Sequence, residues 1–174
     1  MRPYPSEWER HIVLGENWRI FIRPMRSYDE DLVRRFLAHV TADDLRLRFF
    51  APIKEFGQAF IARLTQIDYE RAMALNAIDE ATGEMIGGVR LVADANRETG
   101  EYAVLLRSDL KGRGLGWKLM ELIIEYARTE GMRRIEGQVL GENRVMLRMC
   151  RELGFAISPD PDGADIQRVV LTLS

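Results

Sequence analysis

Six short, mainly apolar stretches of the chain predict β-strands, and the first of them alternates apolar and polar residues strictly enough to indicate a half-buried strand. The six stretches are 17–25, 72–80, 84–94, 101–110, 133–140 and 167–173. The second and third flank the turn sequence Ala-Thr-Gly-Glu, in which Gly83 can adopt a positive φ without cost. We therefore expect these two strands to form a hairpin.

Between the strands, apolar residues recur every three or four positions, which is the period of a helix. After Pro24 ends the first strand, Ser27 and Glu30 predict a capping box and a helix behind it. A second short helix is expected from Thr41. Three further helical patterns cover 55–67, 114–130 and 143–154, and the last two end at glycines.

The order of these elements predicts one mixed α/β (α+β) domain over residues 17–174. A strand and helices are followed by three consecutive strands, then by helix, strand, helix and strand, which favours a sheet of six to seven strands flanked by four to five helices. Residues 1–16 contain two prolines and little periodicity, so they are expected to form an N-terminal arm or the remnant of a linker.

Composition narrows the class of protein. The 174 residues suit a single domain, and a net charge of −2 argues against nucleic-acid or membrane-surface binding. No segment approaches the roughly 18 apolar residues of a membrane span. Cys150 is the single cysteine, so no intramolecular disulfide and no structural metal site are expected. These features indicate a cytoplasmic protein.

Three glycines, Gly112, Gly114 and Gly116, stand directly before the helical pattern at 114–130. The first N–H groups of a helix have no internal partner and carry partial positive charge, so such a loop can bind phosphate. The spacing matches neither a Walker loop nor a dinucleotide fingerprint. The glycines alone leave two interpretations open, an anion site or a tight turn without a ligand.

The wider stretch 110–131 resembles motif A of the GNAT superfamily of N-acetyltransferases, written [R/Q]-x-x-G-x-[G/A]. Gly114 and Gly116 match that pattern, while Lys111 stands where Arg or Gln is usual. The stretch 142–155 resembles motif B, with Asn143 opening its helix. The resemblance extends over roughly residues 18–156 and implies the GNAT fold.

A narrower resemblance links 43–52, 64–75 and 101–116 to the acetyltransferase domain of bacterial Pat-type protein lysine acetyltransferases. It implies that the acceptor is a lysine of a protein, with an acyl-CoA synthetase as the expected partner. Many such domains follow an ADP-forming acyl-CoA synthetase-like region in a longer chain, and residues 1–16 would then be part of a linker.

The resemblance also implies acetyl-CoA as co-substrate and no metal. The backbone of Gly112, Arg113, Gly114, Leu115 and Gly116 would hold its pyrophosphate, with Lys111 and Asn143 at their motif positions. The pantetheine arm would pair with the backbone of the preceding strand near Leu105 and Leu106, in the manner of an added strand.

Acetyl transfer to a lysine needs a base, because the free amine has a pKa of about 10.4 and is protonated at neutral pH. Glu101, expected to be half-buried at the start of its strand, is the candidate, with Asp68, Glu70 and Glu84 as alternatives. Cys150 occupies the motif B position where many GNAT enzymes have a tyrosine as general acid. We interpret it first as a small buried hydrophobe and second as a nucleophile.

The identity of the acceptor remains open at this stage. A small amine in place of the protein lysine, or a non-catalytic domain that senses acetyl-CoA, would preserve the same motifs. Four arginines of the first two helices are most simply a solvated surface and alternatively a docking surface for an acidic protein: Arg34, Arg35, Arg46 and Arg48.

Overall fold

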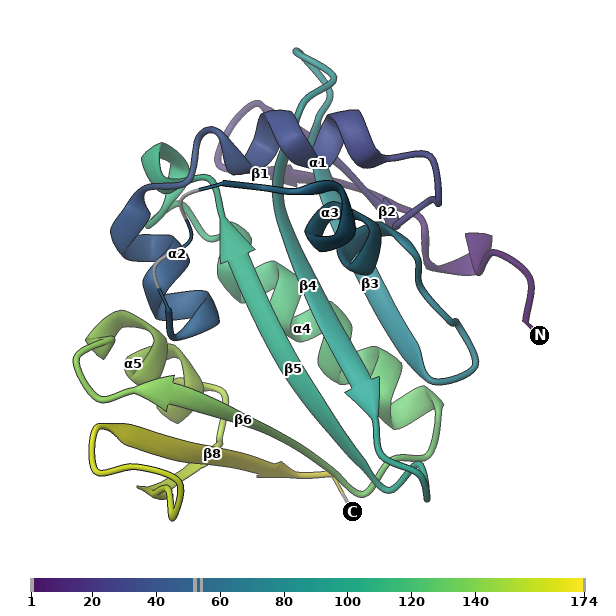
Figure 1. Ribbon diagram of the computed structural model, residues 1–174. Coiled ribbons are helices and arrows are strands. Elements are labelled where there is room, and N and C mark those ends of the chain that lie inside the picture. The colour runs from purple at the N-terminus through teal and green to yellow at the C-terminus, as the bar shows by residue number, and fades with distance from the viewer. Residues whose placement is uncertain (1, 52, 54, 174) are drawn as a thin grey trace.

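The computed structural model describes residues 2–51, 53 and 55–173, and a mixed sheet of eight strands runs through it (Figure 1). In space the strands follow the order β1-β2-β3-β4-β5-β6-β8-β7. Only β5 and β6 are parallel neighbours, and every other neighbouring pair is antiparallel. The strands are β1 (Arg10–Leu14), β2 (Trp18–Pro24), β3 (Ala72–Asp79), β4 (Met85–Ala93), β5 (Thr99–Leu106), β6 (Arg134–Leu140), β7 (Ala156–Pro159) and β8 (Ile166–Thr172).

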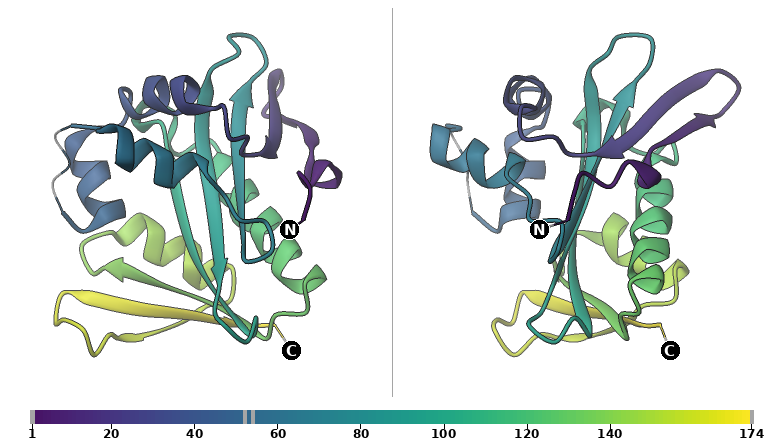
Figure 2. Two further views of the ribbon diagram at one scale, coloured as in Figure 1. Left: turned by 45° about the vertical axis from the view of Figure 1, so that its right-hand side comes forward. Right: turned by 90° about the vertical axis from the view of Figure 1, so that its right-hand side faces the viewer.

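Helices cover both faces of the sheet (Figure 2). One face carries α1 (Glu30–Leu37), α2 (Ala42–Phe49) and α3 (Gln58–Thr65), and the other carries α4 (Leu115–Thr129). The fifth helix, α5 (Arg144–Glu152), joins the α4 side through the buried Cys150. This arrangement confirms the predicted fold. None of the described helices is long and apolar enough to cross a membrane.

Each face of the sheet has its own hydrophobic core. On the α4 side, helical spacing buries Leu119, Met120 and Ile123 against strand residues such as Ile20 and Leu91. On the other side, a smaller core contains apolar residues of α1 and α3 together with Met25, Ala74 and Met85 of the sheet face. The sheet is therefore buried on both faces over most of β3 and β4, whereas residues 103–106 of β5 are only partly buried.

The segment 1–16, expected to be an arm or a linker remnant, contributes a strand and a buried tryptophan to the folded domain. Arg10–Leu14 pairs with β2, and Trp8 is buried with its ring 5.6 Å from that of Tyr126 in α4. We expected six to seven strands, and the structure has eight, because β1 and β7 were not predicted. Both are short edge strands of four or five residues, too short for a clear period-two signal.

The helix caps were predicted with mixed success. Thr41 and Asn143 accept hydrogen bonds from the backbone N–H groups of Asp44 and Met146, each at 3.2 Å, as expected of N-caps. The capping box at Ser27 was wrong, because α1 begins one residue after Asp29. The Asp29 carboxylate accepts two hydrogen bonds of 2.8 Å from the Arg23 guanidinium and one of 2.7 Å from the N–H of Arg26.

The Arg23–Asp29 pair yields a stability prediction, because both side chains are at least 94% buried. We expect Asp29→Ala to lower the free energy of unfolding by about 3–5 kcal/mol, since it leaves a buried arginine without its counter-charge. Urea denaturation measures the loss. The control is Glu84→Ala, which removes an exposed partner of Arg35 and should cost less than about 1 kcal/mol. Equal losses in the two variants would contradict this assignment.

Candidate active site

The parallel strands β5 and β6 pair over only three residues and then separate. Thr99, Gly100 and Glu101 lie opposite Arg134, Ile135 and Glu136, after which β6 continues against β8 alone. Figure 1 shows the two strands diverging from this point. A V-shaped gap thus opens along residues 102–106 of β5, with Glu101 at its apex.

Backbone amides of every second residue of β5 are directed into this gap. Arg107 donates its N–H to the carbonyl of Ile86, and the carbonyl of Thr99 accepts from Asp94, each at 2.9 Å, so the odd-numbered residues bond to β4. Along a strand, the backbone N–H and C=O groups of successive residues point alternately to the neighbouring strand on one side and on the other. Tyr102, Val104 and Leu106 therefore turn their backbone groups toward the missing neighbour, which is the arrangement that an added strand requires.

This alternation changes one of the two residues expected to bind the pantetheine arm. Leu106 keeps that position, but the backbone of Leu105 bonds to β4 opposite Gly88, and its side chain packs with the α1–α3 core. Val104 takes its place in the gap. Strand periodicity indicates that Val104 and Leu106 face the same side. Whether that side is β4 or the gap depends on how β5 pairs with β4, which the sequence alone does not show.

The glycine-rich loop lies at the open end of the gap. Gly112 and Gly114 have φ values of +80° and +91°, a conformation that favours glycine, and α4 begins directly after them. No hydrogen bond from the backbone N–H groups of residues 112–117 is found within the described part of the chain; the first one runs from Lys118 to Gly114. These donors and the N-terminus of a 15-residue helix fit a pyrophosphate.

Side chains of the loop are held by neighbouring elements. The Lys111 amine lies 2.7 Å from Asp44 of α2, and the guanidinium of Arg113 stacks at 4.0 Å on the ring of Trp18. Burial would raise the pKa of Asp44, but hydrogen bonds from Lys111 and Ser108 hold it below its ordinary value. Leu115 is buried in the core. At Gly116 an added Cβ would lie 3.3 Å from Leu106, so the loop closely approaches β5.

Glu101 is exposed, which corrects the expectation that it is half-buried between strands. Across the β5–β6 pair, Glu101 lies opposite Glu136. Among the described residues, Glu101 has no hydrogen-bond or ion-pair partner. The alternative base Glu84 pairs with Arg35 at the other end of β4, and Asp68 and Glu70 lie in the loop before β3. Glu101 is the member of this set that occupies the apex of the gap.

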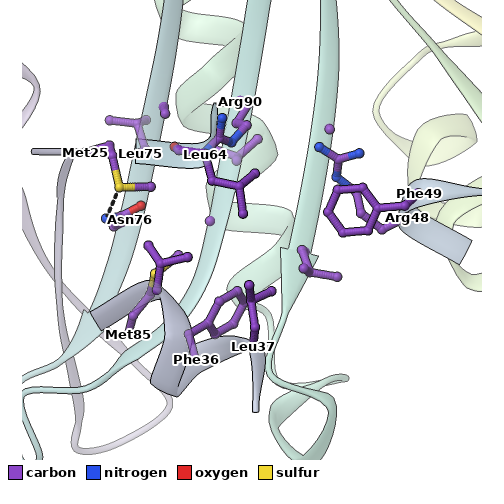
Figure 3. A pocket seen from close by; sticks show the side chains of 16 residues that line it. Met25, Phe36, Leu37, Arg48, Phe49, Leu64, Leu75, Asn76, Met85 and Arg90 are labelled. Carbon is purple, nitrogen blue, oxygen red and sulfur yellow. Dashed lines mark hydrogen bonds between the residues drawn. The ribbon is translucent and has the colours of Figure 1, made fainter. Parts of the chain in front are cut away.

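Two separate hollows lie on either side of Glu101 on the α1–α3 face of the sheet, and Glu101 itself lines the second. The first, which we call the helix-side pocket, lies under α1, α2 and α3 over Ala103 and Leu105 of β5 (Figure 3). It is mainly apolar but contains Arg48 and Arg90.

The second hollow, the acidic pocket, is lined by Glu101, Glu136, Gly137, Gln138, Asp160, Pro161, Asp162 and Arg168. Within it, Glu136 pairs with Arg168 at 2.5 Å, and the buried Asp160 accepts a 3.1 Å hydrogen bond from Gln138. Four carboxylates thus surround a space beside the apex, which favours a cationic group there.

On the opposite face of β5, Tyr102 reaches the buried Cys150. The Tyr102 hydroxyl oxygen and the Cys150 Sγ are 3.2 Å apart, and the ring lies so close to Gly137 that an added Cβ there would be 2.4 Å from it. Burial raises the pKa of both groups. A shielded, protonated thiol is a poor nucleophile, so the geometry favours the interpretation of Cys150 as a packing residue. Sequence reasoning missed Tyr102, although it adjoins Glu101.

The burial of Cys150 generates a labelling prediction. We expect its thiol to react with a disulfide reagent roughly a hundred-fold or more slowly in the folded protein than in urea, because reaction requires local opening. Absorbance of the released thiolate follows the rate in both states. Rapid stoichiometric labelling of the folded protein would show instead that the thiol is accessible and reactive.

Comparison with known proteins adds independent information to this geometry. An acetyltransferase of Pseudomonas aeruginosa is 32% identical over 160 residues, which is 86% of each chain. An L-methionine sulfoximine/L-methionine sulfone acetyltransferase of Pseudomonas paraeruginosa is 33% identical over 99 residues, 57% of each. The crystal structure of the GNAT domain of S. lividans PAT superposes with a TM-score of 0.89 at 27% identity, covering 98% of this chain and 100% of that domain.

The family model described as Acetyltransferase (GNAT) family matches residues 32–155, from within α1 to the third residue after α5. This range contains the V-shaped gap, Glu101, the glycine-rich loop and the capped start of α5. Enzymes of this family use acetyl-CoA. The chain therefore belongs to the GNAT family and is an acetyltransferase.

Proposed function

We propose that this protein transfers the acetyl group of acetyl-CoA to the ε-amine of a lysine in a protein acceptor, with Glu101 as the general base. One observation carries the proposal. The exposed Glu101 carboxylate stands where the gap that fits the acetyl donor closes and where the acidic pocket begins.

The donor would be bound mostly by backbone. Free N–H groups of residues 112–117 would hold the pyrophosphate, and the amides of Val104 and Leu106 would pair with the pantetheine arm. From Leu106 to Tyr102 the strand spans about 13 Å, a distance that an extended arm can cover. The thioester would then lie near the apex and beside Glu101.

Glu101 would supply the proton transfer that the reaction needs. The incoming ammonium first gives one proton to the carboxylate of Glu101, directly or through a water molecule, which leaves the neutral amine. The amine nitrogen then bonds to the acetyl carbonyl carbon, the carbon–sulfur bond breaks with its electron pair leaving on the sulfur, and the second proton of the nitrogen passes to the thiolate or to solvent. A thiol with a pKa of about 8.5 leaves readily as thiolate, so the absence of a tyrosine at position 150 is tolerable.

Two observations support a protein lysine as acceptor. The likeness to the S. lividans PAT domain covers almost the whole chain, and the acidic pocket would attract an ammonium group to Glu101. As part of this proposal, the partner is an acyl-CoA synthetase, which the protein meets either in solution or through an attached ADP-forming synthetase-like region.

A small amine is the second candidate acceptor. It is favoured by the relative that acts on L-methionine sulfoximine and L-methionine sulfone. Incubation of the protein with acetyl-CoA and either acyl-CoA synthetases or free amino acids separates the two, with CoA release and mass spectrometry of acceptor lysines as readouts. Turnover of amino acids alone would overturn the protein-lysine proposal, and no turnover of any amine would overturn both.

The role of Glu101 predicts a selective loss of turnover. We expect Glu101→Gln to lower kcat roughly ten-fold or more, because the amide cannot accept the proton, while acetyl-CoA affinity stays nearly unchanged. Glu98→Gln is the control, since Glu98 directly precedes the same strand and its side chain is 44% exposed. Steady-state CoA release and calorimetric binding provide the two measurements, and equal kcat values for both variants would remove Glu101 from the mechanism.

The role of the loop predicts a selective loss of donor binding. We expect Gly114→Asp to weaken acetyl-CoA binding at least about ten-fold, because it places a negative charge at the start of α4. The matched control is Gly131→Asp at the other end of α4. Both glycines have positive φ, and an added Cβ at either site meets no heavy atom within 4 Å.

Calorimetry with acetyl-CoA and thermal unfolding of both variants test this second expectation. Similar melting temperatures with binding lost in the Gly114 variant alone are the expected result. If the Gly114 variant binds acetyl-CoA as tightly as the Gly131 variant, the loop does not hold the pyrophosphate.

A further inference from the structure

We propose that Arg48 and Arg90 form a carboxylate-binding subsite for the acceptor, so that the amine acetylated beside Glu101 carries a carboxylate or lies next to one. This inference rests on the proposed acetyl transfer at Glu101 and adds a recognition element to it. The two possible sources of the carboxylate are a free amino acid and an acidic residue that flanks an acceptor lysine.

Position is the first argument. Arg90 lies on β4 directly opposite Ala103 of β5, two residues from Glu101 on the same face of the sheet. Arg48 reaches over this face from the last turn of α2, and the negative charge of Glu101 acts on it. Figure 3 shows both arginines at one end of the helix-side pocket, with Phe36, Leu37 and Met85 at the other end.

The second argument is that neither guanidinium has a carboxylate partner among the described residues. Within the part of the chain that the structure describes, Arg90 donates one hydrogen bond, to the carbonyl of Leu64, and Arg48 stacks on Phe49 at 4.4 Å without a hydrogen bond. Arg23 provides the contrast within the same protein, because its buried guanidinium is paired with Asp29 through two hydrogen bonds.

The third argument is electrostatic. Burial, and to a smaller extent the charge of Arg48, lower the pKa of Arg90 to about 10, and burial also lowers the pKa of Arg48. Two partly desolvated cations that repel each other are unfavourable in the empty pocket. An entering carboxylate would relieve this repulsion and meet donors in the fork geometry that suits it.

Together the two hollows make the acceptor site bipolar. Carboxylates of the acidic pocket stand on one side of Glu101, and the two arginines stand on the other. An acceptor whose ammonium and carboxylate groups are a few bonds or one residue apart matches both sides. A simple monoamine or polyamine satisfies only the acidic side and leaves both arginines unpaired.

The test compares acceptors that differ only in the carboxylate. One pair is L-leucine and L-leucinamide, and the other is two hexapeptides of one sequence with Glu or Gln next to a central lysine. We expect kcat/KM to be roughly ten-fold higher or more for the carboxylate member of at least one pair, because hydrogen bonds to a charged group are strong. The pair that shows this preference identifies the source.

Variants locate the preference. Arg48→Gln and Arg90→Gln should each reduce the ratio between carboxylate and amide acceptors toward one. Arg63→Gln should leave that ratio unchanged, because Arg63 also stacks on a phenylalanine, Phe60, but is exposed and outside the pocket. A wild-type ratio near one in both pairs, or ratios unaffected by either pocket variant, would overturn the inference while leaving acetyl transfer intact.

A stability measurement separates a binding role from a structural one and does not need turnover. Arg48→Met and Arg90→Met remove an unpaired cation, so the melting temperature should stay level or rise, whereas Arg23→Met breaks a buried pair and should lower it clearly. A comparable loss in the pocket variants would overturn the inference. If no acceptor is turned over, the proposed function fails. Calorimetry still tests the subsite in that case, because a carboxylate-binding subsite should bind L-leucine more tightly than L-leucinamide.

Discussion

The separation of β5 from β6 after three paired residues is the constraint on which the rest of the site depends. A strand that loses its neighbour exposes a row of amides, and in this protein those amides face a gap with Glu101 at its closed end and the start of α4 at its open end. The Tyr102 ring lies against Gly137 immediately beyond the last paired residues, so side-chain volume fills the beginning of the gap on the α4 side. The proposed donor site would therefore consist mostly of backbone groups, and few of its features depend on particular side chains.

In the proposed mechanism, the two faces of the sheet serve different substrates, the acetyl donor and the acceptor. The α4 side carries the larger core and the helix N-terminus that fits a pyrophosphate. The α1–α3 side contains arginines in two different environments. The buried Arg23 is paired with Asp29, whereas the partly buried Arg48 and Arg90 have no acidic partner among the described residues. A partly desolvated charge without a partner is costly for folding, and this cost is what the proposed carboxylate subsite would explain.

Much of the fold could be predicted because long elements report their period directly. α4 and the central strands β3, β4 and β5 were placed within a few residues of their observed bounds. The elements that were missed, β1 and β7, have five and four residues and pair at the edges of the sheet. Ser27 was a reasonable N-cap by sequence, but the residue before the first turn of α1 is Asp29. The Asp29 carboxylate is paired with Arg23 of β2, and a contact between two elements leaves no local pattern in the sequence.

For the site, the sequence by itself determined the parts that depend on local backbone: the glycines at positive φ, the helix that follows them and the cap at Asn143. It also made Glu101 the candidate base, an assignment that stays a prediction. Only the tertiary structure decided that Glu101 is exposed, that Val104 rather than Leu105 faces the gap, and that Arg48 turns inward while its neighbour Arg46 forms surface ion pairs. The physical reason is that strand pairing and helix packing set the direction of an amide or a side chain, and both join residues far apart in the chain.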